Sequence, residues 1–228
     1  MTKHRANQAL YRRLKLPLKS KRPYFYTNFV QSVDGVVQSR KHPRAYWPLG
    51  SQRDFATLLE LRAHADVLIH GRNTALNSPT LQRLTDPNFQ KRRKQLGKHR
   101  PLLYIVVSRQ AQIMQGLRRS APAYTAIQQV KDKNFSAKKL SAKLYRDGYH
   151  HILVEGGPQL VQSFVQAKLL DELFLTFTPK LLGSEKGNSL HLLEGSMFQP
   201  KRLPQLKLIS QKELDSELFL RYGIQYPR

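Results

Sequence analysis

The chain has 228 residues, a hydrophobic share of 40% and a formal net charge of +24 at pH 7. This length and apolar content are sufficient for one large domain with its own core. The absence of cysteine excludes disulfides, zinc–thiolate sites and thiol nucleophiles, and no apolar run approaches the roughly 18 residues of a membrane-spanning helix. We therefore expect a cytoplasmic protein with no membrane segment.

Positive charge is concentrated in two segments that contain no acidic residue, residues 1–22 and residues 91–100. Such blocks are typical of solvated, mobile segments, so we expect a basic flexible arm over residues 1–22 and a single domain over residues 23–228. Attraction to nucleic acid or to another anionic surface is an alternative, although no nucleic-acid-reading helix or strand motif is recognisable. An Arg-rich, acid-poor N-terminus is also compatible with an organelle transit peptide.

The first predicted element is a strand at residues 24–30, because YFYTNFV is rich in aromatic and β-branched residues. It ends in the turn-like sequence Ser32-Val33-Asp34-Gly35. Residues 36–50 are predicted to form a loop, which contains the only tryptophan, Trp47.

A helix is predicted to begin at Ser51, since Ser51 and Asp54 have the spacing of a capping box. Arg62 falls on or near the apolar face of this helix, where an unpaired charge is costly. Arg62 is therefore either ion-paired within the fold or a binding residue for an anionic ligand.

Strands alternate with helices along the rest of the chain. Apolar runs predict strands at residues 66–70, 102–107, 123–127 and 152–154, and helices are predicted from Ser136 to Gly148 and after Pro158. Three strands then follow in succession, at residues 172–178, 206–210 and 217–222. The alternation indicates a parallel sheet, and the final strands indicate an antiparallel edge. We expect an α/β fold, a single three-layer domain with a mixed, mostly parallel central sheet.

Ligands of open α/β sheets bind at the carboxyl ends of the strands, and four turns occupy this position: residues 32–35, 71–74, 108–109 and 155–158. Glycines allow backbone N–H groups to approach a pyrophosphate, and the helix after Pro158 directs its partial positive charge toward it. Each turn alone is equally compatible with ordinary turn chemistry, and the G-x-G-x-x-G fingerprint is missing. Hydrogen-bond donors suited to phosphates or hydroxyls are Arg72, Thr74, Ser108 and Arg109.

The order of these motifs resembles a known family. SVDG after the first strand, then LRAHADVLIHGRNTALNSPTL, then LVEGGPQLVQSFVQAKLLDELFLTFTPKLLG resemble the reductase domain of bacterial bifunctional riboflavin-biosynthesis proteins. The resemblance covers residues 24–223 and implies the dihydrofolate-reductase-like fold. It also implies an enzyme that uses NADPH to reduce the ribosyl group of a phosphorylated aminopyrimidine to its ribityl form.

The resemblance implies a role for each matching position. The cofactor residues would be Gly156, Gly157, Pro158, Gln159 and Leu160 at the pyrophosphate, Thr74 and Trp47 along the NADPH, and Ser108 near the adenosine. The substrate residues would be Arg62, Glu155, Leu81 and Arg83. The sequence departs from the family pattern at Val36, where a lysine or arginine is usual, and at Asn77-Ser78, where an acidic pair is usual; the deaminase half is absent.

Further expectations concern the cofactor, the catalytic acid, metals and assembly. Ser108, Arg109 and Arg72 favour NADPH over NADH, since cations and hydroxyls suit a 2′-phosphate. Asp34 is the best candidate for a catalytic acid, acting with Glu155, although it could equally close a turn. The histidines show no metal-ligand spacing, so no metal is expected, and we expect a homodimer. The alternative function is a non-catalytic family member whose basic surface binds nucleic acid or acidic partners.

Overall fold

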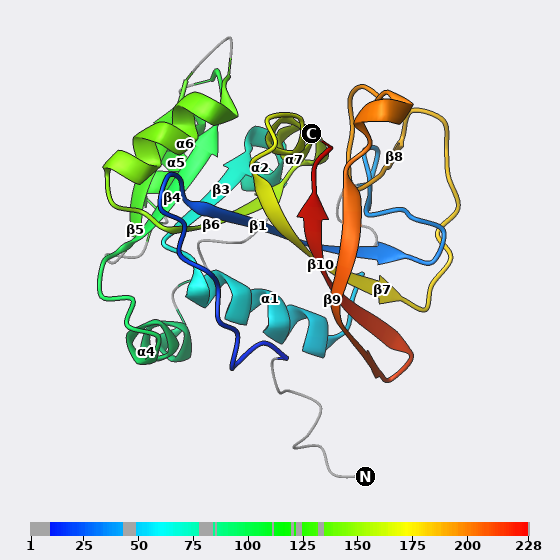
Figure 1. Cartoon of the computed structure of the whole chain (residues 1–228), viewed down its shortest axis with the longest axis horizontal. Helices are drawn as coiled ribbons and strands as arrows, with labels where there is room; N and C mark the ends of the chain where they lie inside the picture. Colours follow the sequence, from blue (N-terminus) through cyan, green and yellow to red (C-terminus); the bar gives the residue numbers. More distant parts are fainter. Residues whose placement is uncertain are drawn as a thin grey trace.

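A computed structural model describes residues 10–42, 49–77, 84, 86–110, 112–119, 121, 125–131 and 135–227. Its centre is an eight-stranded sheet in the order β5-β4-β3-β6-β1-β7-β10-β9. Helices cover both faces of this sheet, with α1 and α4 on one face and α6 and α7 on the other (Figure 1). The predicted three-layer α/β domain with a mixed, mostly parallel sheet is confirmed.

The strands divide into a parallel group and an antiparallel edge. The parallel strands are β1 (Tyr24–Ser32), β3 (Val67–Gly71), β4 (Leu102–Val107), β5 (Thr125–Val130), β6 (His151–Gly156) and β7 (Leu170–Thr178). The antiparallel edge consists of β10 (Glu217–Gln225) and β9 (Gln205–Leu214). A separate short pair is formed by β2 (Gln38–Ser39) and β8 (Ser189–Leu190).

Several helices begin where the sequence supplies a cap or a proline. Ser51 caps α1, because its Oγ accepts hydrogen bonds from the backbone N–H groups of Arg53 and Asp54. Ser136 caps α6 in the same way, and Pro158 lies in the first turn of α7. The helices are α1 (Gln52–His64), α2 (Arg72–Asn77), α4 (Pro87–Gln95), α5 (Ile113–Arg119), α6 (Ala137–Arg146) and α7 (Pro158–Gln166), with a 3₁₀ turn at Pro200–Arg202.

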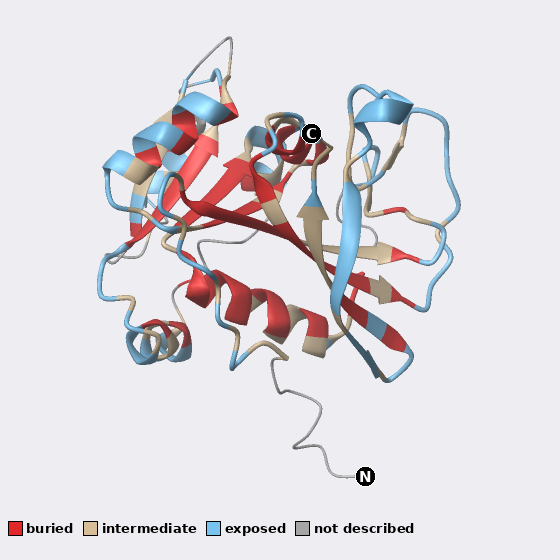
Figure 2. Ribbon diagram, in the orientation of Figure 1, coloured by how far each residue is buried: buried red, intermediate tan, exposed pale blue. Residues whose placement is uncertain are grey.

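Two apolar layers hold the helices on the sheet. Tyr26, Leu68 and Leu153 alternate with Phe25, Ile69 and Val154 along the central strands, so that the first set packs under α1 and the second under α6 and α7. Figure 2 shows this burial along the middle of the sheet, while β9 is exposed along most of its length. Within the described residues, no helix has the length and apolar content needed to cross a membrane.

Nearly all described residues of the two basic segments are exposed or partly exposed, but several of their side chains make fixed contacts with the domain. In the segment expected to be a flexible arm, residues 10–22 lie against the domain: Tyr11 packs edge-on against Phe174, and Lys19 and Arg22 bind Asp171. Residues 1–9 lie outside the described part. In the second segment, Arg93 of α4 is buried and donates to backbone carbonyls. Carboxylates and carbonyl groups that are distant in the sequence therefore bind basic side chains that composition alone predicted to be solvated.

Candidate active site

The central sheet opens between β1 and β6 toward their carboxyl ends. β1 pairs with β6 only over Tyr24–Tyr26, whereas it pairs with β7 as far as Ser32. At the point of separation, Oγ1 of Thr27 donates to the backbone oxygen of Val154 at 2.6 Å. Beyond it, residues 28–31 are partly exposed although β1 is a central strand. This fork lies at the edge of the sheet where α/β proteins bind ligands.

Glycines bring the ends of β3 and β6 into close contact beside the fork. A Cβ atom on Gly71 would lie 3.2 Å from the backbone nitrogen of Gly157, so a larger residue would push the two turns apart. Gly156 has a φ of +110°, which favours glycine, and a cis peptide bond joins it to Gly157. Oγ1 of Thr74 in α2 faces the same two glycines. Four of the predicted cofactor and turn positions therefore meet in one place.

Arg62 is ion-paired within the fold. From α1, its Nε and Nη2 donate to Oε1 and Oε2 of Glu155 at 2.7 Å and 2.6 Å, and the two side chains are only 2% and 6% exposed. Of the two alternatives for Arg62, the structure has the ion pair, and the anion beside it is a carboxylate of the same chain. The resemblance had suggested a ligand anion in that position.

His70 and Tyr104 extend this pair into a buried chain of hydrogen bonds. Nε2 of His70 lies 3.0 Å from Oε2 of Glu155, and Nδ1 lies 2.9 Å from the hydroxyl of Tyr104. An ionised carboxylate only accepts hydrogen bonds. We therefore assign the proton to Nε2, and Nδ1 accepts from Tyr104. Burial lowers the pKa of His70, which agrees with a neutral ring.

Glu155 is ionised at neutral pH. Burial alone would raise the pKa of its carboxyl, but the Arg62 guanidinium and the hydrogen bond from His70 lower it to about 2. A carboxyl group with this pKa is a charged anchor and not a proton donor.

Asp34 closes a turn. Its exposed carboxylate accepts the backbone N–H groups of Leu182 and Gly183 at 3.2 Å and 2.7 Å. Hydrogen bonds from Ser32 and from these backbone groups lower the pKa of Asp34, so it is ionised at neutral pH. The structure thus agrees with the turn-closing interpretation and gives no support to Asp34 as a catalytic acid.

The remaining predicted residues differ in how far their side chains are exposed. Ser108 follows β4 and is buried, with its Oγ accepting from the backbone N–H of Gln110. Arg72 and Arg109 are exposed, and Gln159 is exposed on α7, while Pro158 and Leu160 are buried. The Leu160 side chain belongs to the core beneath α7. Trp47, Leu81 and Arg83 lie outside the described residues.

Asp54 is a candidate site residue that the sequence pattern indicated only as part of a helix cap. It lies in the first turn of α1 and is buried, and its Oδ1 has no hydrogen-bond partner among the described residues. Burial raises the pKa of Asp54 to about 7, against the effect of a hydrogen bond from Thr176. Thr176 pairs with Val30 of the fork. The Ser51–Asp54 spacing did point to this residue, but the cap is Ser51 alone.

Comparison with known proteins agrees with this architecture. The fold is that of dihydrofolate-reductase-like proteins: the chain superposes on dihydrofolate reductase of Enterococcus faecalis with a TM-score of 0.50 and 15% identity, over 89% of this chain and 96% of that one. A pyrimidine reductase-like protein of Corynebacterium diphtheriae gives a TM-score of 0.64 at 17% identity, over 89% and 92% of the two chains.

Residues 23–220 match the RibD C-terminal domain, and the chain belongs to this family. Among curated proteins, it is 25% identical to the 2,5-diamino-6-ribosylamino-4(3H)-pyrimidinone 5′-phosphate reductase of Archaeoglobus fulgidus, over 83% of this chain and 95% of that protein. The predicted family and fold are confirmed. The names of these relatives agree with the predicted pyrimidine reductase and do not favour the non-catalytic alternative.

We predict that Glu155→Gln lowers the free energy of unfolding by about 3–5 kcal/mol at pH 7, because breaking a buried pair leaves Arg62 uncompensated. Urea unfolding measures this change, and the exposed Glu185→Gln serves as the control, with a change within about 0.5 kcal/mol. Since the folded-state pKa of about 2 lies below the unfolded value of roughly 4.3, the wild-type advantage is complete above that value. It should shrink as the pH falls toward 2. Equal stability of variant and wild type at pH 7 would contradict the buried pair.

Proposed function

We propose that the chain is an NADPH-dependent reductase of a phosphorylated aminopyrimidine, resembling 5-amino-6-(5-phosphoribosylamino)uracil reductase of riboflavin biosynthesis. The observation that carries this proposal is the fork between β1 and β6, with the glycine turn at its end, in a member of the RibD C-terminal domain family. The relative from Archaeoglobus fulgidus is a reductase of such a substrate, and the Enterococcus faecalis enzyme was solved with NADP(H). A nicotinamide cofactor supplies a hydride when bound, and the protein supplies binding, orientation and electrostatics.

The residues beside the fork fit a dinucleotide. Gly71, Gly156 and Gly157 leave room for backbone N–H groups to approach a pyrophosphate, and the start of α7 contributes partial positive charge there. Thr74 lies against the same glycines and offers a hydroxyl. In this proposal the backbone of Pro158, Gln159 and Leu160 continues the phosphate site, Ser108 lies near the adenosine, and Trp47 is assigned to the NADPH site on the family resemblance.

The preference for NADPH is assigned to two exposed arginines. Arg72 follows β3 and Arg109 follows β4, and β3 and β4 are parallel neighbours, so both cations lie at the same edge of the sheet. The turn after β4, Ser108-Arg109, has no acidic residue to pair with a free 2′-hydroxyl. The proposal is thus that a 2′-phosphate is recognised by these side chains.

The double variant Arg72→Gln, Arg109→Gln should weaken NADPH binding by about tenfold or more, since each charge-assisted hydrogen bond contributes about 1.5–3 kcal/mol. NADH binding should change by less than about twofold. Fluorescence titration of both cofactors measures the change in preference, with the exposed Arg202→Gln as the control. Parallel loss of both affinities, or equal binding of NADH by the wild type, would contradict this assignment.

The substrate site is proposed on the face of the fork that α1 covers. Glu155 and Arg62 form its floor, and of the roughly four acceptor positions of a carboxylate, Arg62 and His70 occupy three. One position remains for an N–H group of an aminopyrimidine. Leu81 and Arg83 are included in this site on the family resemblance.

Asp54 is proposed as the proton donor in place of Asp34. Hydride addition to the ribosyl carbon breaks its bond to the ring oxygen, and this oxygen takes up a proton to become the ribityl hydroxyl. A buried carboxyl with a pKa of about 7 is partly protonated at neutral pH, which is the state that a general acid needs. Thr176 donates a hydrogen bond to Asp54 and is the register partner of Val30, which supports a position beside the fork.

Asp54→Asn should lower kcat by about a hundredfold or more, the typical contribution of a general acid, with NADPH affinity changed less than about twofold. The acid form is lost as the pH rises, so wild-type kcat should fall as the pH passes through about 7, and the variant should lack this step. Asp34→Asn is the matched control and should keep both kcat and the pH profile. A fully active Asp54→Asn variant with an unchanged profile would eliminate Asp54 as the acid.

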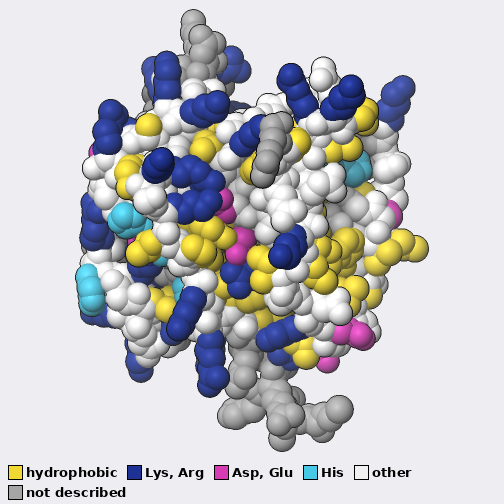
Figure 3. Space-filling view, in the orientation of Figure 1, with side chains coloured by type: hydrophobic (Ala, Val, Ile, Leu, Met, Phe, Trp, Pro, Cys, Tyr) yellow, Lys and Arg dark blue, Asp and Glu magenta, His cyan; other side chains and the backbone are white. Residues whose placement is uncertain are grey.

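A homodimer in the cytoplasm is proposed as the setting of this activity. The edge strand β9 exposes apolar side chains on a long, unpaired edge, with Leu206 48%, Leu208 46% and Ile209 47% exposed. Hydrophobic side chains gather over β9 and β10 in Figure 3. Long exposed edges of this kind are usually covered in stable proteins, and a second copy of the chain would cover this one.

A further inference from the structure

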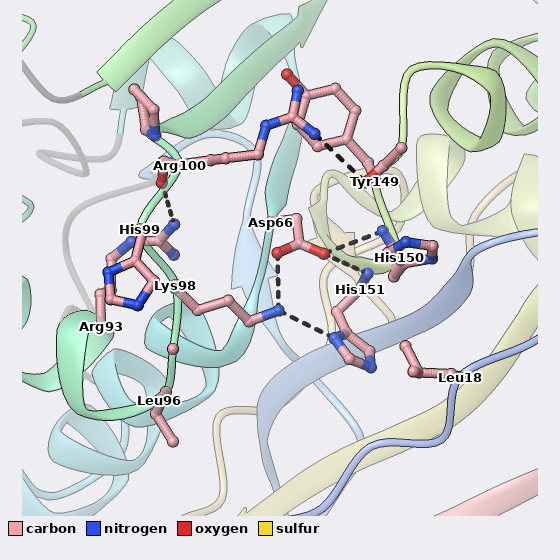
Figure 4. A pocket seen from close by; sticks show the side chains of 13 residues that line it. Leu18, Asp66, Arg93, Leu96, Lys98, His99, Arg100, Tyr149, His150 and His151 are labelled. Atoms are coloured by element: carbon pink, nitrogen blue, oxygen red, sulfur yellow. Dashed lines mark hydrogen bonds and ion pairs between the residues drawn. The ribbon is translucent and has the colours of Figure 1, made fainter.

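A cavity of about 240 Å³ lies at the amino edge of the sheet, opposite the fork. It is bordered by Asp66 before β3, Pro101 before β4 and His151 at the start of β6. One wall is the end of the basic segment, residues 96–100, and the other wall is residues 148–151, with Leu18 at the side (Figure 4). The cavity thus has the C-terminal part of the basic run 91–100 as one of its walls.

The walls of the cavity are held in place by buried contacts. Arg93 is 4% exposed and donates to the backbone oxygens of Ala65 and Arg100, which ties the basic segment to the end of α1. Asp66 accepts Lys98 Nζ at 2.7 Å on one oxygen. Its other oxygen accepts the backbone N–H groups of His150 and His151. Asp66 thus joins one wall to the other (Figure 4).

The charge around the cavity is positive. Among the described residues that line it, Asp66 is the single acidic one, and it already accepts three donors, while Arg93, Lys98 and Arg100 are cationic. Arg100 lies over the ring of Tyr149 at 4.4 Å. Of the N–H groups of its guanidinium, only those on Nη1 donate to described residues, the carbonyls of Asp147 and Gly148. The remaining donors of Arg100 are available to an anion.

We propose that this cavity binds inorganic phosphate or a small phosphate ester, at a site separate from the fork. The planar guanidinium of Arg100 supplies charge-assisted donors for phosphate oxygens. The Lys98 ammonium contacts Asp66 and His151 Nδ1, which leaves its third N–H group to add one more. The volume of about 240 Å³ is below the roughly 300–1,000 Å³ of most ligand pockets, which suits a monoester better than a dinucleotide. A nucleic-acid strand is disfavoured because single strands stack bases on aromatic rings, and Arg100 covers the ring of Tyr149.

Calorimetric titration of the full chain with inorganic phosphate tests this proposal, in low-salt buffer and with NADPH in excess to occupy the fork. We expect saturable binding of phosphate and of glycerol 3-phosphate, and none of glycerol. Arg100→Gln should weaken phosphate binding by about tenfold or more, which corresponds to about 1.4 kcal/mol. The exposed Lys207→Gln on β9 should leave it unchanged.

The variants also distinguish the cavity from other anion sites. Lys98→Gln should weaken phosphate binding as well, and because Lys98 also holds Asp66, its thermal unfolding is measured in parallel. Arg100→Gln is the deciding variant, since Arg100 is exposed and the Asp66 contacts remain. No saturable binding, or binding that Arg100→Gln leaves intact and the fork variant Arg109→Gln removes, would overturn the proposal. So would a short single-stranded RNA that binds more tightly than the ester and is lost in Arg100→Gln.

Discussion

The ion pair between Arg62 and Glu155 is the interaction on which the geometry of the fork depends. It joins α1 to the carboxyl end of β6, one residue before the glycine pair, and both charges are almost fully buried. Removing two charges from water is compensated only by good geometry and by further hydrogen bonds. The bidentate hydrogen bonds from Arg62 and the third hydrogen bond from His70 meet that condition. The end of β6 is thereby fixed at the point where it has separated from β1.

Contacts within the chain fix the fork without a ligand. Thr27 replaces the missing ladder contact with a side-chain hydrogen bond to Val154, so the central strands diverge without leaving that carbonyl unpaired. The buried carboxyl groups of Glu155 on β6 and Asp54 on α1 differ in their pKa values. The pKa of Glu155, which is paired with Arg62, is about 2, and that of Asp54 is about 7. When the pKa values of two acids differ in this way, one can act as a charged anchor and the other as a proton donor. This division is the basis of the proposed mechanism.

Local patterns predicted the elements of the fold well. The alternation of buried strands with capped helices depends on near neighbours, and Ser51, Ser136 and Pro158 mark helix starts as expected. The fork was not predictable, because it depends on how far β1 follows β6 and β7. The partner of Arg62 lies 93 residues away in the sequence. The buried Asp54 was taken for a capping residue, since the same spacing serves both.

Hydrogen exchange of the full chain with and without NADPH tests the central claim most directly, which is that the fork is the cofactor site. The account predicts slower exchange at residues 28–32 and 155–161 when NADPH is present. Exchange along β9 and at residues 97–101 should stay the same. Saturating NADPH that slows exchange only outside these two segments, or nowhere, would contradict it.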